Sequence, residues 1–256
     1  MIGDLINLNL FAFLLVFTRV GTAVMLMPGF GSQQVPENIR LTFALALSFI
    51  LTPALKDVLP GEPAEVSVLF MLLTSEVLIG VFMGMVPRIF ISALQTAGTV
   101  LSMVAGMSNM FIQDPIAEQQ SSLFTTYLGL MALTIVFVTN THHLMLAALV
   151  DSYSLFPPIG GAPIADMSDS LARMISASFA MGVQLSTPLI ISGLAYYLGL
   201  GILGRLMPQL PVFFFGMPIQ IALQMYLLMV ALTSMMMVFM NYFQDGLMGM
   251  APSFGG

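Results

Sequence analysis

The stretch VSVLFMLLTSEVLIGVFMGMV, residues 66–86, decides the fold class. It has about the twenty residues that an α-helix needs to cross the hydrocarbon core of a membrane. One charged side chain, Glu76, stands at its midpoint. A segment of this length and composition predicts an apolar helix at membrane depth.

The composition of the whole chain points the same way. Of its 256 residues, 58% are hydrophobic and 7% are charged, whereas soluble domains carry about a quarter charged residues. This predicts an integral membrane protein, or one buried within a membrane-associated assembly. The net charge of −6 excludes nucleic acid as a partner, because counterion release needs a basic face. Without cysteine there is neither a disulfide framework nor thiolate chemistry.

The hydropathy pattern predicts a single all-α subunit spanning residues 1–256, with about six long apolar helices and no separate soluble domain. The first segment is expected to be retained as structure, because it lacks the basic n-region of a signal peptide. Connections rich in Pro and Gly separate the segments. The predicted helices cover residues 8–27, 39–55, 66–86, 123–138 (which can continue through 150), 174–203 and 212–242, and a semi-apolar stretch covers 89–107.

Small residues recur at helical spacing. Gly80 and Gly84 form one G-x-x-x-G pair, and Gly98, Ser102 and Gly106 continue the pattern. Such rows let helix backbones approach closely in lipid. The pattern predicts tight packing, either within the chain, which is the commoner case, or against other subunits.

Isolated charges within or beside apolar stretches are functional candidates, because burying a charge is costly. For Glu76 the alternatives are a structural ion pair or hydrogen bond, which we favour, and a proton relay. A relay is expected to need a second acidic group at the same depth, and a structural Glu76 is expected to tolerate glutamine. The candidates are Arg19, Glu76, Arg88, Arg173 and Arg205.

The search for an active site finds no candidate. His142 and His143 are adjacent and would point about 100° apart on a helix, so they do not match a shared zinc site. They are expected instead to cap an apolar segment. No nucleophile elbow, phosphate-binding Gly loop or carboxylate pair is present. The sequence predicts no enzyme, cofactor or metal.

A polar stretch interrupts the apolar chain at GMSNMFIQDPIAEQQSS, residues 106–122. Gly106 and Pro115 can end the flanking helices, and Asp114 before a proline favours an extended conformation. At membrane depth such a stretch is tolerated only inside protein or against a water-filled cavity. The alternative is an ordinary solvent-exposed loop. Met103, Met107 and Met110, whose side chains are flexible, approach Phe111 at helical spacing and could form a deformable lining.

Five linked motifs, in order along nearly the whole chain, resemble the FliR family of flagellar type III export-gate proteins. One departure is Pro211, where the family usually has asparagine. The motifs are RVGTAVMLMPGFGSQQVPENIRLTFALALSFILTP (19–53), SEVLIGVFMGMVPRIFISALQTAGTVLS (75–102), GMSNMFIQDP (106–115), THHLMLAALVDSYSLFP (141–157) and GRLMPQLPVFFFGMPIQIAL (204–223).

The resemblance implies a pore-forming subunit in the bacterial inner membrane, at the flagellar basal body. It implies a helical ring made with FliP and FliQ, with FlhB at the entrance, through which unfolded flagellar proteins pass. Residues 1–190 would be a FliP-like part, and residues 191–243 a FliQ-like helical hairpin that turns at Pro208, Gln209 and Pro211.

The resemblance also implies that the loop 106–122 is the plug of the closed channel. The residues implied are Met107, Ser108, Asn109, Met110, Phe111, Ile112, Gln113, Asp114 and Pro115. Met110, Phe111 and Ile112 would form its apolar constriction.

Two other functions stay open at this point. An injectisome relative of the same family would share the fold and the plug. A secondary transporter should show paired broken helices in two repeated halves, and the sequence has no such symmetry.

Overall fold

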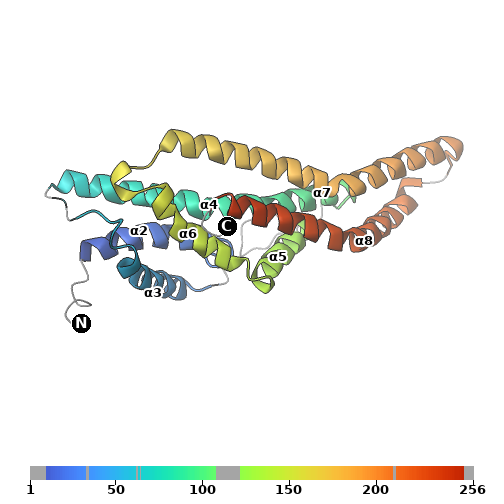
Figure 1. Ribbon diagram of the computed structural model, residues 1–256. Helices are drawn as coiled ribbons and strands as arrows, with labels where there is room; N and C mark the ends of the chain where they lie inside the picture. Colours follow the sequence, from blue (N-terminus) through green and yellow to red (C-terminus); the bar gives the residue numbers. More distant parts are fainter. Residues whose placement is uncertain are drawn as a thin grey trace. The chain divides into compact units, whose positions relative to one another are not determined.

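The computed structural model describes residues 10–32, 35–61, 63, 65–107, 122–209 and 212–250 (Figure 1). The predicted all-α class is confirmed, since these residues form α-helices, one short 3₁₀-helix and no strand. The α-helices are α2 (Leu10–Leu26), α3 (Glu37–Ala54), α4 (Val66–Val104), α5 (Leu123–Val138), α6 (His142–Leu155), α7 (Ile164–Leu206) and α8 (Val212–Met248), and the 3₁₀-helix η1 is Pro158–Gly160.

The predicted number of about six long apolar helices is too high. By length and composition, three described helices can cross a membrane: Val66–Val104, Ile164–Leu206 and Phe214–Met248. The number rises to four if α5 and α6 together make one broken span. Each of α2, α5 and α6 has 17 residues or fewer, and polar residues occupy the first turn of α3. The chain is therefore a helical membrane protein whose described residues hold fewer candidate spans than the number of long apolar helices predicted.

Proline explains one part of that difference. The sequence predicted separate segments at 66–86 and 89–107, on either side of Pro87, but both lie in the single 39-residue helix α4. Proline removes one backbone hydrogen bond from a helix, and neighbouring helices in an apolar environment can satisfy the freed carbonyl. Pro188 and Pro218 likewise lie inside α7 and α8.

The chain forms two compact units from interleaved stretches of sequence. Unit 1 comprises Met1–Phe90, Phe137–Met174 and Phe243–Gly256, and unit 2 comprises Ile91–Val136 and Ile175–Tyr242. Helices α4, α7 and α8 each contribute residues to both units. The division into 1–190 and 191–243 remains a prediction.

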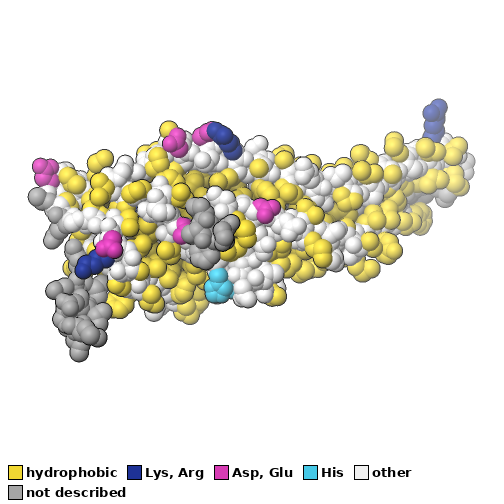
Figure 2. All heavy atoms as spheres, in the orientation of Figure 1, with side chains coloured by type: hydrophobic (Ala, Val, Ile, Leu, Met, Phe, Trp, Pro, Cys, Tyr) yellow, Lys and Arg dark blue, Asp and Glu magenta, His cyan; other side chains and the backbone are white. Residues whose placement is uncertain are grey.

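Within unit 1, helix α3 packs on α2 with its small residues inward. Its buried positions are Ala44, Ser48 and Thr52, spaced four apart, whereas Phe49 and Ile50 are exposed. A surface helix of a soluble protein shows the opposite arrangement. Figure 2 likewise shows apolar side chains over much of the visible surface, with few charged groups. The surroundings of this surface are therefore expected to be lipid or other subunits.

Candidate functional site

Arg19 and Glu76 form an ion pair in the core of unit 1. Arg19 lies on α2 and Glu76 on α4, and both side chains are 0% exposed. The Arg19 Nε–H group donates to Glu76 Oε2 at 2.6 Å, and Nη2 donates to Glu76 Oε1 at 2.8 Å. This two-bond geometry gives the strongest form of a guanidinium–carboxylate contact.

The other donors of Arg19 reach helix α6 and the residue that follows it. Nη1 donates to the carbonyl and the hydroxyl oxygen of Ser152, at 3.1 and 3.3 Å. Nη2 also donates to the carbonyl of Phe156 at 2.9 Å. The Tyr153 ring packs against the guanidinium at 4.0 Å, a cation–π distance. Every N–H of the guanidinium therefore has an acceptor, so the buried charge is fully hydrogen-bonded.

This network ties α2, α4 and α6 together through one side chain. Its geometry favours the ion pair over the proton relay, because the nearest charged partner of Glu76 is the guanidinium rather than a second carboxyl group. Across the described ranges, no three His, Cys, Asp or Glu side chains are placed to hold a metal ion. The candidate site is thus a buried junction of three helices in unit 1.

Three of the four candidate packing glycines lie at close helix crossings within the chain. A Cβ on Gly80 would collide with Thr22 of α2 and lie 2.5 Å from the Arg19 carbonyl, and one on Gly84 would lie 2.7 Å from the carbonyl of Ala23. Gly98 meets α5 in the same way, with the carbonyl of Phe124 at 2.8 Å. These contacts match the first of the two packing alternatives.

Gly106 differs from the other three candidate glycines, because it does not lie at a close helix crossing among the described residues. No described atom lies within 4 Å of the position that its Cβ would take, and its φ is +71°. The Met107 amide donates to the Ser102 carbonyl at 2.9 Å, and the Gly106 amide donates to the Met103 carbonyl at 3.2 Å. These bonds form a Schellman motif, in which glycine supplies the left-handed residue. The described residues thus show Gly106 at the end of a helix, as predicted, and a packing role for it stays a prediction.

Most of the proposed plug lies outside the described residues. Met107 is described, at the end of the Schellman motif. The candidates Ser108 to Pro115 fall within the stretch 108–121, which is not described.

The described residues of this chain do not cover Arg88 and Arg205, so their predicted burial would need other subunits. Both side chains are exposed, on α4 and α7. Hydropathy shows that a charge lies in an apolar segment but not which face of the helix carries it. Arg173, also exposed, pairs with Asp169 one turn away on α7. Among these candidates, the described residues of this chain bury Arg19 and Glu76.

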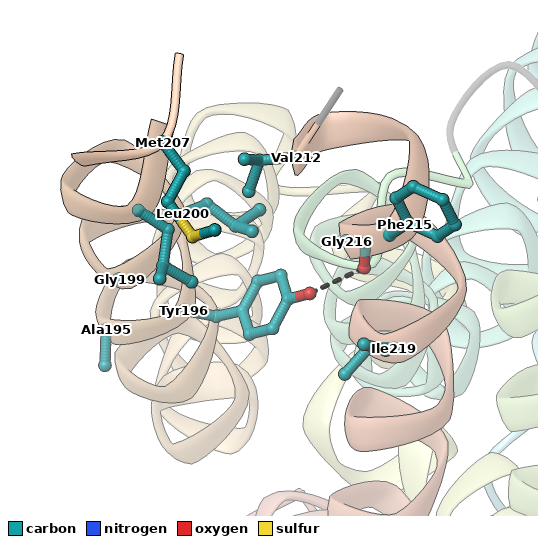
Figure 3. A pocket seen from close by; sticks show the side chains of 10 residues that line it. Ala195, Tyr196, Gly199, Leu200, Met207, Val212, Phe215, Gly216 and Ile219 are labelled. Atoms are coloured by element: carbon teal, nitrogen blue, oxygen red, sulfur yellow. Dashed lines mark hydrogen bonds between the residues drawn. The ribbon is translucent and has the colours of Figure 1, made fainter. Parts of the chain in front are cut away.

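The turn predicted at Pro208 and Gln209 connects α7 to α8, while Pro211 lies outside the described residues. The two helix ends face each other across this turn (Figure 3). The Tyr196 hydroxyl of α7 donates to the Gly216 carbonyl of α8 at 2.6 Å. Beside this bond lies an open, apolar cavity of about 570 Å³. This part of unit 2 is therefore a helical hairpin with an incompletely filled tip.

His142 is the first residue of helix α6, and Thr141 occupies the N-cap position, so the capping role of the two histidines stays a prediction. Its ring stacks on Phe137 with centroids 4.9 Å apart.

Sequence reasoning missed the residues that complete the Arg19 network. Ser152, Tyr153 and Phe156 lie more than 130 residues away along the chain. They fall within one of the five motifs, but no spacing rule connects them to Arg19. Sequence reasoning also missed Gln220 and Gln224, two buried amides in helix α8. The signal in the sequence was the presence of two polar side chains, four residues apart, within an apolar segment.

The sequence of the chain matches known proteins over most of its length. The profile of the family described as "Bacterial export proteins, family 1" matches residues 10–246. The flagellar biosynthetic protein FliR of Caulobacter vibrioides is 37% identical over 231 residues, which cover 90% of this chain and 92% of that protein. FliR of Bacillus subtilis is 33% identical, covering 91% and 90%.

A relative with a different name also matches. The Yop proteins translocation protein T of Yersinia pestis is 26% identical, covering 92% of this chain and 91% of its own length. The FliR proteins above are more similar to this chain. On the strength of the profile match and the identities, the chain belongs to family 1 of the bacterial export proteins, together with the flagellar biosynthetic protein FliR.

Proposed function

We propose that this chain is a non-enzymatic structural and gating subunit of the flagellar protein export channel, in the inner membrane at the basal body. The observation that carries the proposal is the family match, which extends over residues 10–246. The higher identity to FliR proteins than to the Yersinia translocation protein supports the flagellar channel over the injectisome. Energy for transport would come from other components.

The proposed partners are FliP and FliQ in a helical ring, with FlhB at its entrance and unfolded flagellar proteins as the substrates. The exposed apolar side chains on α7 and α8, such as Leu198, Phe214 and Met229, support a need for neighbours. In this proposal residues 1–190 correspond to FliP, and the hairpin 191–243 corresponds to FliQ.

Purification of the tagged chain from its own cells tests the assembly. We expect FliP and FliQ to co-purify, and deletion of the gene to abolish flagella and motility. Co-purification of injectisome counterparts, with motility intact, would contradict the flagellar function.

The gating role rests on the loop 106–122. The proposal is that its apolar centre, Met110 to Ile112, excludes water from the pore while its flanking polar residues meet water. Because assembly would depend on the helices beside the loop, deleting residues 108–113 should leave the ring assembled but leaky to ions.

Conductance in planar bilayers measures this difference. The wild-type complex should be closed and the deleted complex open, at equal subunit composition. An exposed connecting loop predicts equally low conductance for both complexes, and that result would reject the plug.

A further inference from the structure

Helix α3 carries a face of mostly large apolar side chains that the described residues leave exposed. The helix packs on α2 within unit 1 (Figure 1), and its buried positions hold only small residues. Between positions 39 and 50, seven residues are exposed, and the five large ones among them are 38% to 66% exposed. We name these seven residues the exposed face of α3: Ile39, Leu41, Thr42, Leu45, Ala46, Phe49 and Ile50.

The polar side chains in the middle of α3 need no partner from outside the helix. Residues 41–55 include three hydroxyl groups and no other polar side chain. The hydroxyls of Thr42, Ser48 and Thr52 each donate to the backbone carbonyl one turn earlier, at 2.7 to 2.8 Å. In hydrocarbon, polar groups must be satisfied within the protein, because no water is present. This part of α3 therefore meets the condition for contact with lipid chains.

Charged residues lie only at the two ends of α3. Glu37 and Arg40 are in its first turn, Lys56 and Asp57 follow its last turn, and residues 41–55 carry no charge. The helix has 18 residues, so it is about 27 Å long. The hydrocarbon core of a bilayer is about 30 Å thick, and Arg and Lys side chains can extend from a helix end toward the headgroups. Length and charge placement together fit α3 to the thickness of a membrane.

The sizes of the side chains favour lipid over another helix on the exposed face. Helix interfaces within membranes are rich in small residues, which let backbones approach closely. On α3 the face toward α2 has this composition, with Ala44, Ser48 and Thr52 buried. The exposed face has the opposite composition, because five of its seven residues are Ile, Leu or Phe. The helix thus already uses its small residues in a contact within the chain.

We propose that the exposed face of α3 contacts the acyl chains of membrane phospholipids, with the charged ends of the helix at the headgroups. Helix α3 is then a lipid-facing helix in addition to the three candidate spans. The lipid contact does not depend on what the complex transports, so it can fail while the proposed function holds, and the reverse.

Photo-crosslinking identifies what covers the exposed face. Benzoylphenylalanine, a photoreactive phenylalanine analogue, would replace Phe49 in the tagged chain, and the assembled complex would be irradiated in the membranes of its own cells. Mass spectrometry of the purified chain should then show phospholipid adducts. Phe43 provides a matched control on the same helix, because it is half-buried and its ring stacks on Phe30 with centroids 5.3 Å apart. The analogue at position 43 should form adducts within the chain instead.

Cysteine labelling separates lipid from water. The chain has no native cysteine, so Phe49→Cys and Asp57→Cys each introduce a single thiol into the tagged chain. The reactive form of a thiol is the thiolate, which apolar surroundings disfavour, so Phe49→Cys should react with a water-soluble maleimide at least about tenfold more slowly than Asp57→Cys. Asp57 is exposed beyond the end of α3, where the proposal places the headgroups and water.

Three results distinguish the possible neighbours of the exposed face. Phospholipid adducts at position 49 together with slow maleimide labelling support the proposal. A protein adduct at position 49, to another subunit or to another part of this chain, would overturn it. Labelling of Phe49→Cys as fast as that of Asp57→Cys would overturn it in favour of water. If the variants at position 49 do not assemble, Ile50, which is 66% exposed, takes the same two substitutions with the same outcomes.

Discussion

Replacing Glu76 by glutamine should cost nearly as much stability as replacing it by alanine. From the sequence alone, glutamine was expected to substitute for Glu76, because it has the same shape and keeps a hydrogen-bonding group. The structure changes that prediction, because both carboxylate oxygens accept N–H groups of the buried Arg19 guanidinium. A glutamine would keep one acceptor and direct its own amide N–H groups at another donor.

The size of the expected loss in folding stability follows from the burial of the Arg19–Glu76 pair. Arg19 and Glu76 are both 0% exposed, so glutamine would leave a positive charge in the core with only neutral acceptors: its own amide oxygen, Ser152 and Phe156. Breaking a buried pair by removing one partner costs about 3–5 kcal/mol. That is a large share of a typical folding free energy of about 5–15 kcal/mol. Replacing both partners by apolar residues of similar volume should recover most of the loss.

A double-mutant cycle in the purified complex tests this reasoning. Thermal unfolding and assembly yield would be measured for Glu76→Leu, Arg19→Met and the double variant, and Glu76→Gln would be compared with Glu76→Ala. Asp169→Asn serves as the control, because its pair with Arg173 is exposed and should contribute about 0–1 kcal/mol. Wild-type stability of Glu76→Gln, or additive losses in the double variant, would refute the argument.

Four further predictions concern other positions. Gly80→Ala should destabilise the protein by about 1–3 kcal/mol, because the new Cβ collides with Thr22. Gly199→Ala should not destabilise it, because no described atom lies within 4 Å of the Cβ position. Thermal unfolding of both variants tests this difference. Gly106→Ala should cost about 1 kcal/mol because φ is +71°, and Gly106→Asn should cost less; equal costs in denaturation would argue against the Schellman ending. Phe111→Ala should leak less than the 108–113 deletion in bilayer conductance, since flexible Met110 can partly fill the gap. The chain expressed without partners should aggregate or unfold readily in detergent, and a monodisperse, heat-stable monomer on a sizing column would contradict this.

Local patterns predicted the parts of the structure that local physics controls. The apolar run 66–86 lies in one helix because a helix satisfies its own backbone at membrane depth. The spacing of Gly80 and Gly84 indicated a close crossing, which α2 provides. Gly106 predicted a helix end, since glycine readily adopts the left-handed conformation found there.

The remaining features depend on partners far apart in sequence. Arg19 meets Glu76 across 57 residues and Ser152 across 133, and no periodicity relates such positions. The exposed faces that carry Arg88 and Arg205 are also set by packing, so hydropathy could not separate them from Arg19. Pro87 looked like a boundary, although a proline inside an apolar helix need not end it.

The interleaving of unit 1 bears on how the chain is made. Phe243, near the end of α8, packs edge-to-face on Phe90 at 6.1 Å, and a Cβ on Gly246 would lie 2.5 Å from that same ring. At about 5–20 residues per second, a ribosome needs roughly 8 to 30 seconds to travel from one phenylalanine codon to the other. During translation the apolar surface around Phe90 therefore stands without its final neighbour, and the insertion machinery or a chaperone must shield it until α8 emerges.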